Sequence, residues 1–488
     1  MSSFKDFVKA RKAAAAKGGA AADKTPAPAP RRPPAAAPPQ IAPQPPARPP
    51  YAGPRVLMVT TANLFVYDNS GRSSDMTKRP TGGLTLTYAL TRYVKRALAA
   101  RVVAVDFVFK HYEREARRWE GLDVDCVRLG CDPQIAAGAY DVVVVSSPEL
   151  GVCRWVSAHC DAPLKIAMCH DYAGAPWGPF TNTDEDQREE LYAVLAGWRL
   201  LTDSQHVADY HNRFAPEAYS ARGLANPPTA RQCYGACYGY YERHRMPHFA
   251  DAIDREYVTI ISPCAPKGLS MIAALSPMMP TTKFLCVATA WTNGVVQHIL
   301  KRFENVDIQM GTQNVDDFYA QTKVLIVPSI WPEAFGLVTM EASARGIPVV
   351  STDHGGLAEA NPVARLKIRT PYFYDHAGFQ LLQNTTLDDM MERPRPPPPD
   401  DVVAAGSDAE KRQEKVSKHL LRCLLHIAPQ DVALPFANLI HALMTDDALY
   451  AAAAADARKS GLAFIEKHED KMDAIIAEDF ANPAVFKF

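Results

Sequence analysis

Two carboxylates, Glu333 and Glu341, lie eight residues apart in a segment whose pattern predicts a strand, a loop and a helix. The apolar run 324–327 is followed by a Pro-bearing loop, and a helical pattern then opens near Phe335 and stops at Gly346. The N-terminus of such a helix offers free amides and a partial positive charge, which suit a diphosphate. A carboxylate farther along can accept hydrogen bonds from the hydroxyls of a ribose or hexose. The segment therefore predicts a sugar-nucleotide site.

Strand-like and helix-like patterns alternate along two stretches of the chain, and this alternation predicts parallel α/β sheets. The strand-like runs of the first stretch are 55–61, 102–109, 141–146, 164–169 and a short last run near 201–204. Those of the second stretch are 257–261, 283–288, 306–310, 324–327 and 348–351. Ligands of open α/β sheets bind outside the carboxyl ends of the strands. The sequence thus predicts an α/β protein with two Rossmann-like domains that face a cleft.

Shifts in composition suggest where these domains begin and end. Residues 54–215 form the first predicted domain. The alternation of strand-like and helix-like patterns stops over 216–252 and resumes over 253–455, which is the second predicted domain. We interpret 216–252 as a linker or an insertion, and a Pro-rich stretch at 390–411 as a surface loop of the second domain. Residues 456–488 are predicted to be C-terminal helices. Helical patterns are clearest at 84–99, 414–426, 433–444, 446–467 and 471–480.

Residues 1–53 form an arm that is dominated by Ala, Pro, Lys and Arg. Such a stretch cannot bury enough apolar surface to offset the entropy of ordering it, so we predict a disordered or polyproline-like arm. Its nine lysines and arginines outnumber Asp6 and Asp23, and residues 4–9 have the pattern of a short basic amphipathic helix. A solvated tail is the favoured interpretation, and peripheral contact with an anionic membrane is the alternative.

Composition argues against several classes of protein. The formal net charge of −1 over 488 residues leaves no large basic field for a nucleic acid. No apolar run reaches the length of about 18 residues that spans a membrane, and the start lacks the apolar core of a secretory signal. The ten cysteines are scattered, and Cys233 and Cys237 form one C-x3-C pair without a second pair at zinc-finger spacing. We therefore expect a cytoplasmic protein with reduced thiols and no structural metal.

Several motifs follow the order found in the retaining GT-B glycosyltransferases of family 4, and the chain resembles this family over roughly residues 55–375. The leading motif is E-x7-E with A-F-G-L-V inside it, continued as E-A-x-A-x-G-x-P-V-V through Val350. The resemblance implies that Glu341 holds the ribose hydroxyls of the donor and that Glu333 contacts the donor sugar near its reacting end. It also implies that the diphosphate meets the amides around Phe335, Gly336, Leu337 and Val338.

Other segments match the family at single positions. Gly82 and Gly83 correspond to its N-terminal Gly-rich loop, where the backbone can approach a phosphate or sugar. His170 follows the strand 164–169, and the resemblance implies that it approaches the donor sugar and helps to organise the reaction centre. Lys267 matches a lysine that neutralises the donor phosphates, and Gly311 matches the loop that cradles the nucleobase. The resemblance makes His170 and Glu333 the candidate catalytic residues.

Two positions depart from the family pattern. Ser262 stands where many members carry an Arg five residues before Lys267, and 287–290 stands where the family commonly ends a strand in glycines. Neutralisation of the phosphates then falls on Lys267 and the helix amides. A catalytically degenerate binding or scaffold protein remains open as an alternative.

The resemblance implies transfer of a hexose from a UDP-, GDP- or ADP-sugar to a hydroxyl of a glycan, lipid or other acceptor, with retention of configuration. The acceptor would bind to domain 54–215 and the donor to 253–455, with helices 456–488 packing back on the first domain. No tightly bound cofactor and no metal are expected. A sugar-nucleotide epimerase of the same fold is a second alternative. The D-x-D form at 123–125 is typical of metal-dependent transferases of another fold, and we interpret it as a solvated turn.

Overall fold

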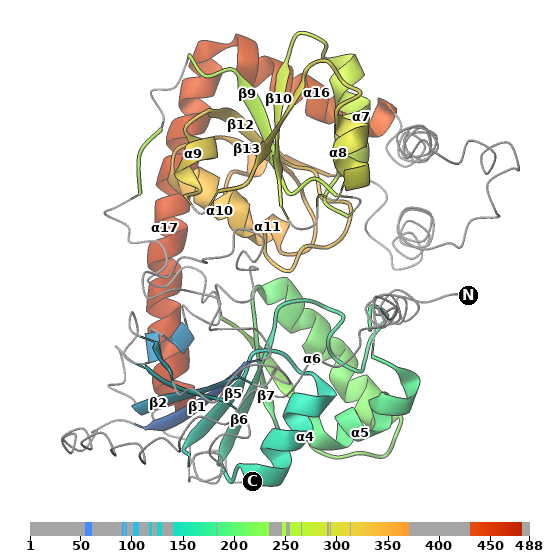
Figure 1. Ribbon diagram of the computed structural model, residues 1–488, viewed down its shortest axis with the longest axis vertical. Coiled ribbons are helices and arrows are strands. Elements are labelled where there is room, and N and C mark those ends of the chain that lie inside the picture. Colours follow the sequence, from blue (N-terminus) through green and yellow to red (C-terminus); the bar gives the residue numbers. More distant parts are fainter. Residues whose placement is uncertain are drawn as a thin grey trace, which may run out of the picture.

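The computed structural model of the chain contains two β-sheets, each with helices packed on it (Figure 1). It describes residues 54–60, 90, 91, 93, 94, 101–106, 117–119, 124–128, 140–181, 183–233, 246–249, 254–264, 266–289, 292, 294–312, 314–369 and 430–480. The predicted arm over 1–53, the Gly82–Gly83 loop, the Pro-rich loop at 390–411 and the predicted helix at 414–426 lie outside these ranges. The predicted pair of α/β units is confirmed.

The first sheet has eight strands in the order β3-β4-β2-β1-β5-β6-β7-β8, and every neighbouring pair is parallel except β3 with β4. Its strands are β1 (Arg55–Thr60), β2 (Arg101–Asp106), β3 (Arg117–Trp119), β4 (Val124–Arg128), β5 (Val142–Val145), β6 (Leu164–Cys169), β7 (Arg199–Thr202) and β8 (Thr229–Gln232). Strand β5 consists of four valines without solvent exposure, as expected of a parallel strand that is covered on both faces. Three helices share one core with this sheet: α4 (Leu150–His159), α5 (Glu185–Leu195) and α6 (Gln205–Ser220).

The first sheet corrects two predictions. Val124 and Asp125, expected in a solvated turn, begin β4 (VDCVR), which pairs with β2 on one side and β3 on the other. Strand β8 lies inside the segment 216–252 that was interpreted as a linker or an insertion. This four-residue strand is paired on one side only, by β7, and it carries too few apolar residues to stand out in the sequence.

The second sheet has six parallel strands in the order β11-β10-β9-β12-β13-β14. Its strands are β9 (Tyr257–Ile261), β10 (Lys283–Ala288), β11 (Val306–Met310), β12 (Thr322–Val327), β13 (Val349–Thr352) and β14 (Lys367–Ile368). One core holds α7 (Leu269–Met278), α8 (Gly294–Leu300) and α16 (Gln430–Thr445) against it. A second core holds α9 (Asp316–Tyr319), α10 (Leu337–Ala344) and α11 (Leu357–Ala360). The sheet is therefore the middle of three layers.

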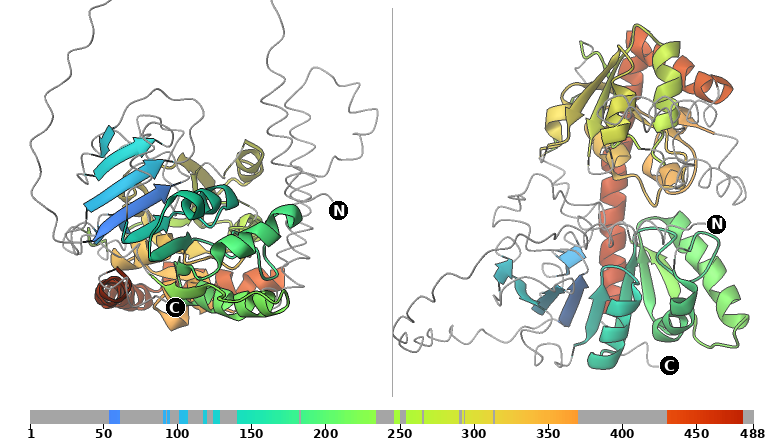
Figure 2. Two further views of the ribbon diagram at one scale, coloured as in Figure 1. Left: turned by 90° about the horizontal axis from the view of Figure 1, so that it is seen from below. Right: turned by 45° about the vertical axis from the view of Figure 1, so that its right-hand side comes forward.

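Helix α17 (Asp447–Phe480) is a single helix of 34 residues, although two helices were predicted over 446–467 and 471–480. The residues between those two patterns, 468–470, contain neither Gly nor Pro, so nothing stops the helix there. The domain boundary expected after residue 455 falls inside α17. The helix runs beside both sheets (Figures 1 and 2), and its Glu478 forms an ion pair with Arg231 of β8 at 2.8 Å.

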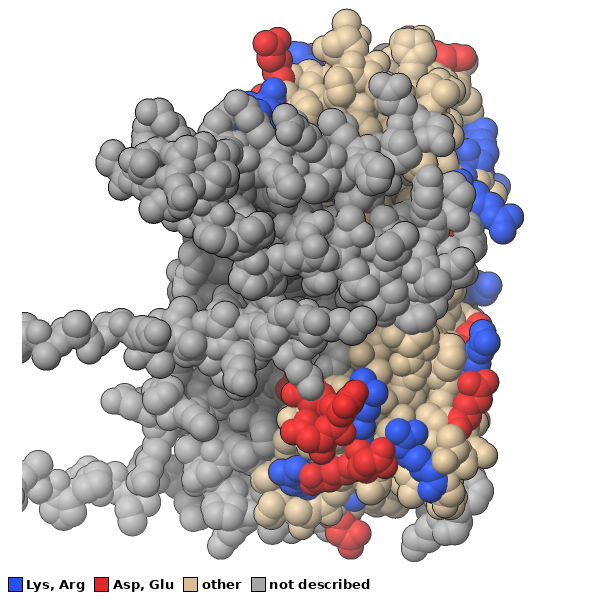
Figure 3. Space-filling view, turned by 90° about the vertical axis from the view of Figure 1, so that its right-hand side faces the viewer, with Lys and Arg blue, Asp and Glu red and all other residues tan. Residues whose placement is uncertain are grey.

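Acidic side chains gather on the lower part of the face shown in Figure 3, on the side where α5 lies in Figure 1. Helix α5 carries the exposed residues Glu185, Asp186, Glu189 and Glu190. Two of them are ion-paired, Glu189 with Arg222 and Glu190 with Arg154. Within the described part of the chain, no helix is long and apolar enough to cross a membrane.

Candidate active site

Lys267 and Glu333 meet at one edge of the second sheet. Lys267 lies beyond β9 and Glu333 beyond β12, and these neighbouring strands are parallel, so their carboxyl ends open on the same side. Lys267 Nζ donates a hydrogen bond to Glu333 Oε1 at 2.7 Å, and Ser329 Oγ donates to the same oxygen at 2.7 Å. Glu333 is only 7% exposed. The structure thus brings together the predicted phosphate-binding cation and the predicted sugar-binding carboxylate.

The charges of this pair depend on each other. Burial alone would raise the pKa of the Glu333 carboxyl, but the Lys267 ammonium and the hydrogen bonds from Lys267 and Ser329 outweigh burial, and the net shift is downward. Burial alone would lower the pKa of Lys267, but the Glu333 carboxylate outweighs it, and the net shift is upward. Both residues are therefore charged at neutral pH.

Helix α10 begins two residues later than the sequence predicted, at Leu337. Gly336, its N-cap, has φ +99°, a backbone conformation that side chains with a Cβ rarely adopt, and a Cβ placed there would lie 2.4 Å from Leu357 Cδ2. Leu337 and Val338 lie in the first turn, whose amides lack acceptors within the helix. Phe335 is 4% exposed and packs on Phe464 of α17, with ring centroids 5.7 Å apart. The Phe335 side chain therefore belongs to the core.

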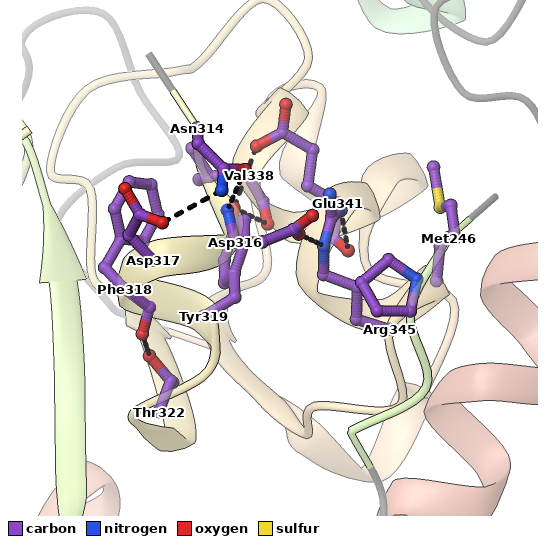
Figure 4. Close-up of polar contacts among 12 residues, drawn as sticks. Met246, Asn314, Asp316, Asp317, Phe318, Tyr319, Thr322, Val338, Glu341 and Arg345 are labelled. Carbon is purple, nitrogen blue, oxygen red and sulfur yellow. Dashed lines mark hydrogen bonds and ion pairs between the residues drawn. The ribbon is translucent and has the colours of Figure 1, made fainter. Parts of the chain in front are cut away.

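Glu341, in the second turn of α10, is 7% exposed and has its own partners. Tyr319 donates a hydrogen bond from its hydroxyl to Glu341 Oε2 at 2.8 Å (Figure 4). The Glu341 carbonyl accepts from the Arg345 guanidinium at 3.0 Å, and Arg345 also pairs with Asp316 at 2.6 Å. A carboxylate buried among small and apolar residues of this helix needs a partner, and Tyr319 is one.

His170 lies at the carboxyl edge of the first sheet, directly after β6. Its Nδ1 is 3.1 Å from both carboxylate oxygens of Asp203, which stands directly after the neighbouring parallel strand β7. Burial alone would lower the pKa of His170, but Asp203 outweighs burial and the net shift is upward. The other ring nitrogen, Nε2, is shielded from solvent and has no hydrogen-bond partner among the described residues.

Tyr172 connects the edges of the two sheets. Its hydroxyl donates to the Glu333 carbonyl at 3.3 Å and lies 2.9 Å from His206 Nδ1. The same Glu333 carbonyl accepts from the Gly356 amide at 2.7 Å. The loop that carries Glu333 is therefore held from both sheets.

Comparison with known proteins finds a family match over the segment that carries Glu333 and Glu341. The sequence model of the family described as "Glycosyl transferases group 1" matches residues 300–362, a range that includes Glu333, α10 and Glu341. The chain is similar to this family over that range. It is 29% identical over 97 residues to the "Uncharacterized 42.6 kDa protein in cps region" of Klebsiella pneumoniae, a match that spans 20% of this chain and only 26% of that protein.

The fold of this chain is GT-B. The structure of Anabaena Alr3699/HepE in complex with UDP-glucose superposes on it with a TM-score of 0.53 and 13% sequence identity. The superposition covers 87% of this chain and 100% of the Anabaena chain. At that identity the likeness concerns the fold alone.

The two departures from the group 1 pattern contact each other. Ser262 Oγ lies 2.6 Å from Thr289 Oγ1, and Ser262 adopts φ +59°. Ser262 is buried, at 8% exposure. A short hydroxyl pair thus stands where the family commonly has an arginine and a glycine-rich strand end.

The remaining predicted positions are less informative. Gly311 is buried after β11, and its amide donates to the Ala288 carbonyl at 2.8 Å. Gly82 and Gly83 lie outside the described residues. Among the described residues, no group of three or more His, Cys, Asp or Glu side chains is placed to hold a metal ion.

Sequence reasoning missed three polar partners in the site. Asp203 had a usable signal, since it follows a strand as His170 does. Tyr172 and Tyr319 had none, because their partners are distant in sequence: Tyr172 contacts a carbonyl 161 residues away and Tyr319 a carboxylate 22 residues away.

Proposed function

We propose that this chain transfers a hexose from a nucleoside-diphosphate sugar to an acceptor hydroxyl, with retention of the anomeric configuration. The observation that carries the proposal is the ion pair of Lys267 and Glu333, set beside the N-terminus of α10 within the group 1 motif. A cation, a carboxylate and helix amides in one place match a diphosphate with a sugar attached.

The proposed chemistry asks the protein for positioning and charge stabilisation. The leaving diphosphate gains negative charge as the glycosidic bond breaks, and Lys267 and the first-turn amides of α10 would stabilise it. Glu333 would then direct its carboxylate to the sugar hydroxyls. The acceptor hydroxyl would attack the anomeric carbon on the face that the diphosphate leaves, and a phosphate oxygen would take its proton.

His170 has the geometry of a residue that contacts the sugar from the first sheet. His170 Nδ1 donates a hydrogen bond to the Asp203 carboxylate, which fixes the orientation of the ring. We assign Nε2 to the donor sugar, because it has no partner among the described residues. In this scheme the first sheet binds the acceptor and the second sheet binds the donor.

UDP-, GDP- and ADP-sugars are the candidate donors to test. The Anabaena protein of the same fold was solved with UDP-glucose, which makes uridine diphosphate the first nucleotide to try. Glycans, lipids and small hydroxyl compounds are the acceptor classes to test. No metal is added in the first assays, and a parallel series with magnesium tests whether one is used.

The test incubates the purified full chain with each nucleotide sugar and measures the melting temperature and the release of nucleoside diphosphate. We expect one nucleotide to raise the melting temperature and Glu341→Ala to abolish that rise. NMR of the product should show the anomeric configuration of the donor. Release of nucleotide without any acceptor would favour the epimerase. Stabilisation without turnover would favour a degenerate binding protein, and no response to any donor would contradict the proposal.

A further inference from the structure

Tyr319 has no solvent exposure, and its hydroxyl is directed at the carboxylate of Glu341 (Figure 4). The hydroxyl donates to Glu341 Oε2 at 2.8 Å and is 3.3 Å from the Val338 carbonyl. A hydrogen bond to an ionised carboxylate is stronger than one between neutral groups, and it also fixes the direction of the carboxylate. Tyr319 therefore restricts the rotamer of Glu341.

The Tyr319 ring is itself held in place. The Arg345 guanidinium lies over the ring at 4.9 Å from its centroid, while Arg345 Nε pairs with Asp316 at 2.6 Å. Arg255 donates to the Tyr319 carbonyl at 3.2 Å. Because α9 and α10 are joined through these contacts, the phenol and the carboxylate cannot separate without breaking the network.

Tyr319 also lies close in sequence to the segment predicted to hold the nucleobase. It is the last residue of α9, which begins five residues after Gly311. One short helix thus connects the predicted base loop with the partner of the predicted ribose carboxylate. A movement of α9 would change both contacts together.

We propose that Tyr319 is a positioning residue for nucleotide recognition: it holds the Glu341 carboxylate in the orientation that accepts the ribose hydroxyls. This inference rests on the proposed function, because it needs a nucleotide at Glu341. The physical basis is preorganisation. A carboxylate that is already oriented loses less conformational freedom when the ribose binds.

The test compares Tyr319→Phe with the unsubstituted full chain by isothermal titration calorimetry. Six probes are used: UDP, GDP and ADP, and the 2′,3′-dideoxy form of each. Tyr257→Phe is the matched control, because the Tyr257 hydroxyl also donates to a carboxylate of the second sheet, but to Asp307 Oδ2 of β11 at 2.7 Å rather than to Glu341. We expect Tyr319→Phe to weaken the binding of the ribonucleotide about 10-fold. Binding of its dideoxy form should be unchanged.

The ratio between ribo and dideoxy forms separates positioning from general damage. Equal loss for both forms would overturn the inference in favour of a structural role for Tyr319, as would no loss for either. In a Glu341→Ala background, Tyr319→Phe should cause no further loss for the ribonucleotide, and an additive loss would also contradict the inference. If the unsubstituted chain binds none of the six probes, the proposed function fails and the inference fails with it.

Discussion

At the scale of single residues, the site depends on charges that are neutralised by one specific partner. The pKa of Glu333 stays low mainly because Lys267 lies beside its Oε1, with a smaller contribution from the hydrogen bond of Ser329. A diphosphate at Lys267 would compete with Glu333 for the ammonium. Glu333 would then be released toward the donor sugar.

Lys267→Met should destabilise the fold at neutral pH, because it leaves the buried Glu333 carboxylate without its cation. We expect a loss of about 2 kcal/mol in the free energy of unfolding, below the about 3–5 kcal/mol of a fully buried pair, because Lys267 is partly exposed. The pKa of Glu333 is depressed in the folded chain, so the stabilisation is present above the unfolded pKa and is lost as pH falls through the folded pKa. Urea unfolding at pH 7 and pH 4 checks this.

Lys283→Met is the matched control for that measurement. Lys283 pairs with Glu256 at 2.7 Å, but both side chains are more than half exposed, so the expected change is within about 0.5 kcal/mol at either pH. A loss for Lys267→Met that does not shrink at pH 4 would contradict the assignment to the Glu333 charge.

At the scale of elements, α10 is fixed by its contact with α17. Gly461 of α17 packs so closely on α10 that an added Cβ would lie 2.7 Å from the Ala344 amide nitrogen and 2.8 Å from the Ser343 carbonyl carbon. Arg458, one turn earlier, donates to the Ala344 carbonyl. Helix α17 therefore supports the helix that carries Glu341.

Gly461→Ala tests this contact, because the added methyl group favours the helix but overpacks the contact with α10. Alanine favours the helix by up to about 1 kcal/mol, while overpacking against backbone atoms costs about 1–3 kcal/mol. We expect a net loss of about 1–2 kcal/mol in the free energy of unfolding, measured by urea titration. The exposed neighbour Lys459→Ala should stay within about 0.5 kcal/mol. A stabilised Gly461→Ala variant would show that the two helices can separate at little cost.

At the scale of the whole molecule, the two sheets are joined by a carboxylate at a helix N-terminus. Glu359 of α11 accepts hydrogen bonds from the amides of Gln205 and His206 at 2.9 and 2.7 Å. These amides open α6, on the first sheet. A negative charge is favoured there by the helix dipole. Together with the contact of Tyr172 and Glu333, this capping brings the predicted donor and acceptor sides against each other.

Glu359→Gln should weaken this connection by about 1 kcal/mol, because the anion at the start of α6 is lost. We expect the radius of gyration from small-angle X-ray scattering to rise as the two sheets separate more often. Glu217→Gln, on the exposed side of α6, is the control and should leave the scattering unchanged. Identical scattering from all three proteins would mean that other contacts hold the sheets together.

The sequence by itself determined the local elements. Strands β6, β9 and β10 begin and end at the predicted residues, because a buried parallel strand is a mostly apolar run. Strand β11 also has the predicted limits, although it is a partly exposed edge strand. The strand–loop–helix segment around Glu333 and the stop at Gly346, which has φ +79°, are likewise local properties of the chain. Lys267 and Glu333 were both predicted as donor residues from the motifs that resemble the family.

Only the tertiary structure decided which side chains meet. The pairs His170–Asp203, Tyr319–Glu341 and Glu359–α6 join segments that are 22 or more residues apart. The sequence places Asp203 after a strand, but no local pattern says which side chain each of these residues contacts. The short strands β3, β4 and β8 were missed for the same reason. Their stability comes from neighbouring strands rather than from their own residues. Hydrophobic periodicity fixes an element, whereas the orientation of a polar side chain depends on which other elements the sheets bring beside it.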